Sequence, residues 1–167
     1  MAILDILKYP DEALKQVSEP VELFDDQLQN FLVDLEETMW AGPGGVGIAA
    51  PQVGCFKRIA IVDVSSKPKI KHNGCMILIN PEIKTWEGMK IGREGCMSVP
   101  DYTGNVIRAE KITLQACNAQ GELIDYECTG YEARAVQHEL DHLDGLLFLD
   151  RLVSRRTDLF KRKVYKK

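Results

Sequence analysis

The sequence lacks any apolar run long enough to cross a bilayer, which takes about 20 consecutive apolar residues in a helix. It also lacks a recognisable export signal, because the N-terminal apolar portion contains Asp5 and Lys8 and no small-residue cleavage site follows it. These two absences exclude the membrane-spanning and secreted classes. We therefore expect a soluble, cytoplasmic protein with no membrane partner.

The sequence also lacks the even number of cysteines that a disulfide framework requires. Its five cysteines, in a chain without an export signal, indicate reduced thiols, each by default a small buried hydrophobic residue. A second domain is not required either, since 167 residues suffice for one domain that buries roughly 70% of its unfolded surface. We expect residues 1–167 to form a single domain.

Histidine is scarce, with three in 167 residues, yet His138 and His142 lie only four positions apart. On an α-helix these positions share a face, so both imidazoles can reach one metal ion while Glu139 points at a water bound to it. This is the layout of a metal hydrolase. The alternatives are a chance occurrence and a structural metal site, which needs four protein ligands and has no use for the glutamate. His72 lies among polar neighbours and is predicted to be solvated.

A catalytic metal usually has three protein ligands and one open position, so this motif needs a third ligand. Two known completions are absent: Phe148 stands where one group of metalloproteases has a third histidine, and no glutamate follows Glu139. Asp141, Asp144 and Asp150 remain downstream. The first two are expected on other faces of the helix or beyond its end, which favours a ligand from an earlier part of the chain.

Among the cysteines, Cys96 is the better candidate for this ligand. It lies in the segment 92–100, a polar, turn-like setting flanked by glycine and closed by proline, where a thiol would be presented rather than packed. Cys55, which is also beside a glycine, is the second candidate.

Residues 42–52 form a glycine-dense stretch of small residues, GPGGVGIAAPQ. The stretch lacks the Gly-Lys-Ser/Thr ending, the preceding strand and the following helix of a phosphate-binding loop, which excludes that class. Its glycines let a backbone approach another chain closely. We expect an extended segment that lines a cleft and pairs with a peptide, with Gln52 as a polar side chain at its end.

Periodicity predicts an α+β fold, with antiparallel or mixed β-sheets around a central metal-binding helix. An amphipathic helix is expected from Asp25 or Asp26 to Gly42, and the metal-binding helix from Tyr131 to Gly145. Strands are expected at 58–64, 76–80, 83–91, 112–116 and 123–128, with a hairpin between the last two. Ser154 is expected to cap a C-terminal helix over 154–167.

The charge is unevenly distributed along the chain. Residues 151–167 contain eight Lys or Arg and the single acidic residue Asp158, a local charge of +7, although the whole chain carries −4. The other 150 residues therefore carry −11. A basic tail on an acidic body indicates either a solvated helix end or a segment that docks on a polyanion such as RNA.

Three stretches taken together resemble the signatures of the peptide deformylase family. They are Gly45–Gln52 (GVGIAAPQ), Glu94–Ser98 (EGCMS) and Gln137–Gly145 (QHELDHLDG). They occur in the family's order, and the likeness extends from residue 9 to residue 150. The resemblance implies an enzyme that removes the formyl group from the N-terminal methionine of nascent peptides and releases formate.

The resemblance also implies roles for particular residues. Cys96, His138 and His142 would bind one divalent metal ion, Fe²⁺ in the family, which Zn²⁺ or another divalent ion can replace. Glu139 would be the general base. The amide of Gln52 and the backbone N–H of Met97 would stabilise the oxyanion, and Met97 replaces a common leucine without affecting a backbone role.

The remaining expectations concern partners. The N-formyl-methionyl peptide would lie extended along Gly45, Val46 and Gly47, with Val46 as a wall for the methionine side chain. The basic tail, which varies within the family, would contact the ribosome. The alternative hypotheses are a metallopeptidase that cuts ordinary peptide bonds, and a non-catalytic ribosome- or RNA-binding module with a structural metal.

Overall fold

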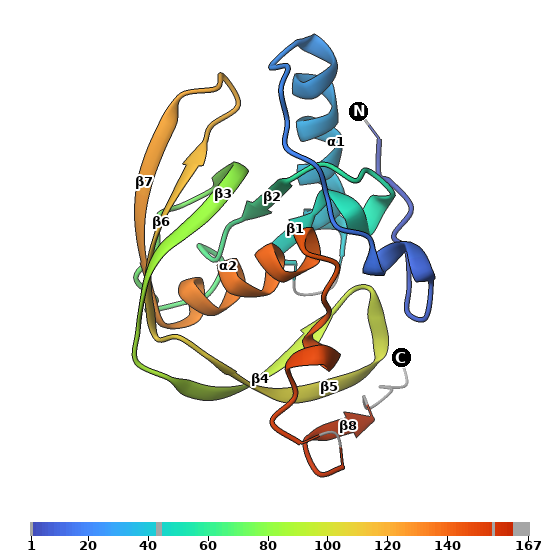
Figure 1. Ribbon diagram of the computed structural model, residues 1–167, viewed down its shortest axis with the longest axis vertical. Coiled ribbons are helices and arrows are strands. Elements are labelled where there is room, and N and C mark those ends of the chain that lie inside the picture. Colours follow the sequence, from blue (N-terminus) through green and yellow to red (C-terminus); the bar gives the residue numbers. More distant parts are fainter. Residues whose placement is uncertain (1, 43–44, 155, 162–167) are drawn as a thin grey trace.

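The computed structural model describes residues 2–42, 45–154 and 156–161. Within them the fold is α+β, as predicted, with α-helices packed against two antiparallel sheets (Figure 1). The elements in chain order are η1 (Glu12–Lys15), α1 (Asp26–Ala41), β1 (Gly47–Ala49), η2 (Ala50–Val53), β2 (Ile59–Val62), β3 (Met76–Glu87), β4 (Lys90–Cys96), β5 (Val99–Arg108), β6 (Lys111–Cys117), β7 (Leu123–Thr129), α2 (Gly130–Leu143), η3 (Phe148–Arg151) and β8 (Leu159–Lys161). Among the described residues no helix is both long and apolar enough to span a bilayer.

The larger sheet has five strands in the order β1-β2-β3-β6-β7. Every residue of β2 is buried, because α2 packs on one face of this sheet and α1 lies near its β1 end. Figure 1 shows α2 in the centre of the molecule, between this sheet and the smaller one. The helix that carries the histidines is therefore covered on most of its surface, and nearly every residue from Glu132 to Leu143 is buried.

The smaller sheet has three strands in the order β4-β5-β8. It has an apolar cluster of its own, separate from the clusters around α2 and α1, made of Leu14, Val99, Val106, Leu147 and Phe148. This cluster places the end of β4, and with it Cys96, beside the C-terminal half of α2.

The helix α1 follows its prediction closely. Asp25 is the N-cap, and its carboxylate accepts a hydrogen bond from the Leu28 amide at 3.0 Å. The predicted apolar face is buried at Leu28, Leu32, Leu35 and Met39. The helix ends at Ala41, immediately before the glycine-dense stretch.

Three strands differ from the predictions. The expected strands 76–80 and 83–91 are largely one strand, β3, whose register shifts between Ile79 and Glu82, so the proline at 81 bends the strand without ending it. The turn-like segment around Cys96 is instead the end of β4, and a tight hairpin leads from it into β5. β5 was not predicted, because Pro100 and Gly104 interrupt its apolar pattern.

The predicted C-terminal helix over 154–167 is wrong for the residues that the structure describes. Leu159–Lys161 form the strand β8, which pairs with Tyr102–Gly104 of β5. The aromatic ring of Phe160 lies 3.8 Å from the guanidinium of Arg93, a cation–π contact that holds this strand on the smaller sheet. Tertiary pairing therefore outweighs helix propensity here, while residue 155 and residues 162–167 lie outside the described part.

Candidate metal centre

The helix α2 brings the two predicted histidines together. Their ring centroids are 5.1 Å apart, and both side chains are buried. The helix ends before Gly145, which adopts the left-handed conformation with φ +76°. A Cβ atom at Gly145 would collide with the carbonyl of Lys15, so the glycine also lets the N-terminal segment pack against this end of the helix.

The third donor is Cys96, at the end of β4. Its Sγ lies 3.4 Å from His142 Nε2, and the ligand atoms of Cys96, His138 and His142 all lie within 4.8 Å of one another. Metal bonds of about 2.3 Å to sulfur and about 2.0 Å to nitrogen separate two tetrahedral ligand atoms by about 3.5 Å. The three donors therefore fit a single tetrahedral ion that keeps one position open.

The other candidates for the third ligand are engaged elsewhere. Cys55 packs near α1, and burial raises the pKa of its thiol. The carboxylate of Asp141 binds two arginines, and that of Asp144 pairs with Arg58 at 3.0 Å. Asp150 accepts a hydrogen bond from the Leu147 amide.

Glu139 lies beside this group of donors. Its Oε1 is 4.0 Å from His142 Nε2 and, among the described residues, is buried without a hydrogen-bond partner. Burial raises the pKa of its carboxyl group to about 7. On the strand β1, a Cβ atom at Gly47 would lie only 2.6 Å from Glu139 Oε2. The glycine thus makes room for a carboxylate whose unsatisfied oxygen suits a water molecule next to a cation.

The side chain of Gln52 is fixed within the site. Its Oε1 accepts a hydrogen bond from the Ala49 amide at 2.9 Å, and its Nε2 donates to Ser98 Oγ at 3.0 Å. Nε2 also lies 3.4 Å from Cys96 Sγ, so its second hydrogen is directed toward the donors. Met97 lies in the turn after β4 and lines the same cavity.

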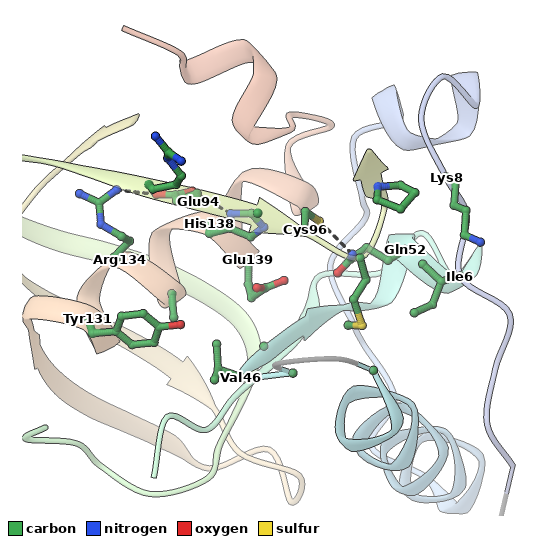
Figure 2. Close-up of a pocket in the computed structure, with 18 of the residues that line it drawn as sticks. Ile6, Lys8, Val46, Gln52, Glu94, Cys96, Tyr131, Arg134, His138 and Glu139 are labelled. Atoms are coloured by element: carbon green, nitrogen blue, oxygen red, sulfur yellow. Dashed lines mark hydrogen bonds and ion pairs between the residues drawn. The ribbon is translucent and has the colours of Figure 1, made fainter. Parts of the chain in front are cut away.

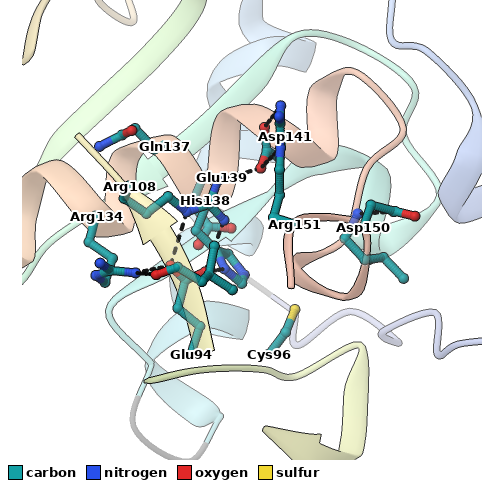
Figure 3. Close-up of polar contacts among 12 residues, drawn as sticks. Glu94, Cys96, Arg108, Arg134, Gln137, His138, Glu139, Asp141, Asp150 and Arg151 are labelled. Carbon is teal, nitrogen blue, oxygen red and sulfur yellow. Dashed lines mark hydrogen bonds and ion pairs between the residues drawn. The ribbon is translucent and has the colours of Figure 1, made fainter. Parts of the chain in front are cut away.

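Sequence reasoning missed Glu94, which orients His138. The Oε1 of Glu94 lies 2.8 Å from His138 Nδ1, and its carboxylate accepts two hydrogen bonds from Arg108 at 2.9 and 3.0 Å and one from Arg134 at 2.6 Å (Figure 3). Because the carboxylate is an acceptor, Nδ1 carries the proton and Nε2 is left free to bind a metal. Burial alone would raise the pKa of Glu94, but the hydrogen bonds from His138 and Arg108 outweigh it and hold the pKa well below its usual range.

Asp141 extends these contacts to the other side of Arg108. Its carboxylate accepts hydrogen bonds from Arg108 and from Arg151, the latter through Nε at 3.2 Å and Nη2 at 3.1 Å. A signal for these residues exists in the sequence. Arg134, His138 and Asp141 have helical spacing for one face, and Glu94 is two positions from Cys96 and so shares its face of a strand.

The two imidazoles have opposite tendencies to bind a proton. Burial lowers the pKa of His138, but Glu139, Cys96 and Glu94 together raise it above its ordinary value. Burial and the neighbouring His138 lower the pKa of His142 well below its ordinary value. Without a metal, His142 is therefore neutral and keeps a nitrogen lone pair available as a ligand.

A cavity of about 880 Å³ opens beside these residues (Figure 2). Gly45, Val46 and Gly47 line it, as the sequence predicted, together with Gln52, Cys96 and Glu139. The strand β1 is the last strand of its sheet and pairs only with β2 among the described residues, so its other edge is available to an extended peptide. The cavity also receives Leu4, Ile6 and Lys8 from the N-terminal segment, which sequence reasoning did not include.

Comparison with known proteins bears on the function of this site. Residues 3–158 match the family model described as polypeptide deformylase. A peptide deformylase of Thermodesulfovibrio yellowstonii is 42% identical over 163 residues, which cover 98% of this chain and 97% of that protein.

Solved structures agree in fold. The peptide deformylase of Thermotoga maritima superposes with a TM-score of 0.84 at 36% identity and covers 91% of this chain and 99% of its own. An actinonin-bound class I type b peptide deformylase of Acinetobacter baumannii gives a TM-score of 0.82 at 36% identity, with coverages of 90% and 98%. The chain thus belongs to the polypeptide deformylase family, enzymes that remove the N-formyl group from nascent peptides.

Proposed function

We propose that residues 1–167 act as one catalytic domain that hydrolyses the formamide of N-formyl-methionyl nascent peptides in the cytoplasm and releases formate. Cys96, His138 and His142 hold one divalent metal ion, and Glu139 acts as the general base. The observation that carries this proposal is the unpartnered, buried oxygen of Glu139, which lies beside three metal-binding atoms in an open cavity.

Fe²⁺ is the proposed ion, and Zn²⁺ or another divalent ion could replace it. The set of one thiolate and two imidazoles suits both metals, and the choice of Fe²⁺ follows from the family. When bound, such an ion supplies Lewis-acid chemistry, which polarises a carbonyl group and makes water more acidic.

The protein groups supply proton transfer and charge stabilisation. Glu139 takes a proton from the attacking water, whose oxygen forms a bond to the formyl carbon. The C–N bond then breaks as Glu139 passes this proton to the departing amine, so that water and formamide become formate and a free N-terminus. Burial raises the pKa of the Glu139 carboxyl group above its ordinary value, which suits a group that both takes up and releases a proton.

Gln52 and Met97 stabilise the carbonyl oxygen as it becomes negatively charged. The Gln52 amide supports this role because Ser98 and the Ala49 amide already hold it in place, so little reorganisation is needed. Met97 would donate its backbone N–H from the turn after β4. One such donor is typically worth about 2.7 to 4 kcal/mol of the barrier.

The substitution Glu139→Gln tests this mechanism. We expect metal-loaded Glu139→Gln protein to keep its metal and lose about 10²- to 10⁴-fold in formate release from N-formyl-methionyl-alanyl-serine, because the base is gone. The matched control is Glu82→Gln, which alters an exposed ion pair with Lys84 and should leave activity unchanged. Full activity in Glu139→Gln would contradict the mechanism.

The same assay separates the alternatives. A metallopeptidase would cut methionyl-alanyl-serine without a formyl group and release no formate. A module with a structural metal would give no turnover of either peptide in the wild-type protein.

We also propose that the basic tail contacts the ribosome. Residues 162–167 contain four Lys or Arg and no acidic residue, which suits a phosphate backbone. Deleting them, which leaves β8 intact, should weaken cosedimentation with ribosomes, and the difference should shrink as salt is raised. Unchanged cosedimentation at low salt would contradict this contact.

A further inference from the structure

The N-terminal segment, residues 2–9, precedes the first helix and is tied to the site by its backbone. The Leu7 N–H donates to the Gln52 carbonyl at 2.7 Å, and two residues later the Tyr9 N–H donates to the Ser98 carbonyl at 2.7 Å. Figure 2 shows Ile6 and Lys8, the neighbours of Leu7 in the chain, beside Gln52. The segment thus binds the backbone of both residues that form the Gln52–Ser98 hydrogen bond inside the site.

The Gln52 carbonyl needs this donor because its own helix does not use it. Gln52 lies in η2, a 3₁₀-helix, in which a carbonyl ordinarily accepts from the N–H three residues further on. That donor would be Cys55, but the Cys55 N–H bonds instead to the Ala50 carbonyl at 3.1 Å. Gln52 is only 1% exposed, and a buried carbonyl without a partner is costly. The bond from Leu7 therefore fixes the orientation of this peptide group.

Leu7 is itself held in place from two directions. Its side chain packs against the apolar cluster of the smaller sheet, which includes Val99 and also contacts Cys96. Three residues earlier in the chain, the Leu4 N–H donates to the hydroxyl of Thr38, a buried residue of α1, at 2.8 Å. The Leu7 N–H is therefore a positioned donor, anchored by the smaller sheet and by α1.

We propose that Leu7 is a positioning residue, which aligns the Gln52 amide with the developing oxyanion through the bond from its backbone N–H to the Gln52 carbonyl. This inference rests on the proposed function, in which Gln52 donates to that oxyanion, and deepens it. Ser98 and the Ala49 N–H hold the end of the Gln52 side chain, and Leu7 holds the backbone from which that side chain starts. Placement matters to such a donor, because a displacement of about 1 Å can cost about 10²-fold in rate.

Replacing the Leu7 amide by an ester provides the test, because the ester lacks the N–H and keeps the side chain. The sequence Gly54-Cys55 allows a synthetic segment 1–54 to be ligated to a recombinant segment 55–167 without adding a residue. The ester also weakens the Ile6 carbonyl as an acceptor, but this carbonyl accepts no hydrogen bond within the described residues. The matched control is an ester at Val17, whose N–H likewise has no acceptor in the described part of the chain.

The two esters and the ligated wild-type chain would be compared after loading with metal. We expect the Leu7 ester to lower kcat for N-formyl-methionyl-alanyl-serine by about three- to tenfold, as for one hydrogen bond, and to leave KM unchanged. Calorimetry should show wild-type affinity for the product methionyl-alanyl-serine, because the product carries no oxyanion. Unchanged product affinity would also show that the ester protein is folded. The Val17 ester should match wild type in all three measurements.

Removal of the Gln52 side chain shows whether Leu7 acts through it. In the Gln52→Ala background the Leu7 ester should cause no further loss, whereas a general structural role would give the same loss in both backgrounds. Wild-type kcat in the Leu7 ester, or an equal loss in the Gln52→Ala background, would overturn the proposal. Weaker product binding would also overturn it, because Leu7 would then act on the cavity wall. If the recombinant wild-type protein released no formate, the proposed function itself would fail.

Discussion

Glu94 illustrates how a single residue sets the chemistry of its neighbours. Its carboxylate is 6% exposed and bonds to one imidazole and two guanidinium groups, so it is a buried charge with every lone pair in use. A buried ion pair with these contacts contributes less to net stability than to geometry, since desolvation offsets most of its Coulomb energy. Its main effect is to fix the tautomer and the angle of His138.

The substitution Glu94→Gln should therefore weaken metal binding and stability together. Loss of an outer partner of a metal ligand typically costs about 10- to 100-fold in affinity. Breaking a buried ion pair typically costs about 3 to 5 kcal/mol, and the loss here should be smaller because Arg108 keeps its ion pair with Asp141. Metal titration of the apo protein and urea unfolding would measure the two effects. Glu82→Gln is again the control, and metal affinity within twofold of wild type would contradict this role.

The stability that Glu94 contributes to the folded protein depends on pH, and the direction follows from the depressed pKa of its carboxyl group. Because the folded-state pKa of Glu94 is depressed, the unfolded state binds more protons between that value and the usual pKa of 4.5. The stability from Glu94 is therefore fully present above about pH 4.5 and is lost as the pH falls below it. Unfolding of wild type and Glu94→Gln should differ by a constant amount at higher pH and converge in acid.

At the scale of single elements, the strand β1 is as important to the site as the helix α2. Gly47 in β1 lies against the Glu139 carboxylate, and the open edge of the same strand faces the cavity. One short strand thus sets the position of the Glu139 carboxylate and also borders the cavity in which the peptide is proposed to lie.

The substitution Gly47→Ala tests whether Gly47 serves the site by leaving room for the Glu139 carboxylate. The added Cβ atom would lie 2.6 Å from Glu139 Oε2 and would force the carboxylate aside, which should cost about 10²-fold in kcat with little change in metal content. The double variant Gly47→Ala with Glu139→Gln should be no slower than Glu139→Gln alone. Additive losses in the double variant would show that Gly47 acts by another route.

Periodicity was sufficient for α1 and α2, but not for the smaller sheet, whose strand β8 lies where a C-terminal helix was predicted. The apolar spacing of α1 and the paired histidines of α2 are local signals, and both helices occur where they were predicted. β5 and β8 are stabilised by pairing with each other and by Phe160 on Arg93, contacts that no local pattern records. The partners of Glu94 lie 14, 40 and 44 positions away in the chain, so the sequence predicted His138 as a ligand but not the carboxylate that orients it.

At the scale of the whole molecule, the candidate metal centre lies where two sheets meet. Two donors belong to α2, which packs on the larger sheet, and the third belongs to β4 in the smaller sheet, which has its own apolar cluster. A bound ion would therefore add a link between two parts of the molecule that also meet through the polar contacts of Glu94, Arg108 and Asp141.

Removing the metal should loosen the smaller sheet selectively. We expect a chelator, or Cys96→Ser with its loss of bound metal, to speed amide hydrogen exchange in β4 and β5 by about tenfold or more, while β2 and β3 keep their rates. Mass spectrometry of exchange with and without metal measures this. Equal acceleration in both sheets would indicate global destabilisation instead.

The open edge of β1 has a consequence for timing. The strand is three residues long, and its first residue, Gly47, lines the cavity beside Met97 and Glu139, so an extended chain end can reach it and the edge of a folded sheet cannot. A protein whose N-terminus has already been incorporated into its own structure is thus no longer a substrate. The formyl group must therefore be removed before the N-terminal segment of each new chain folds.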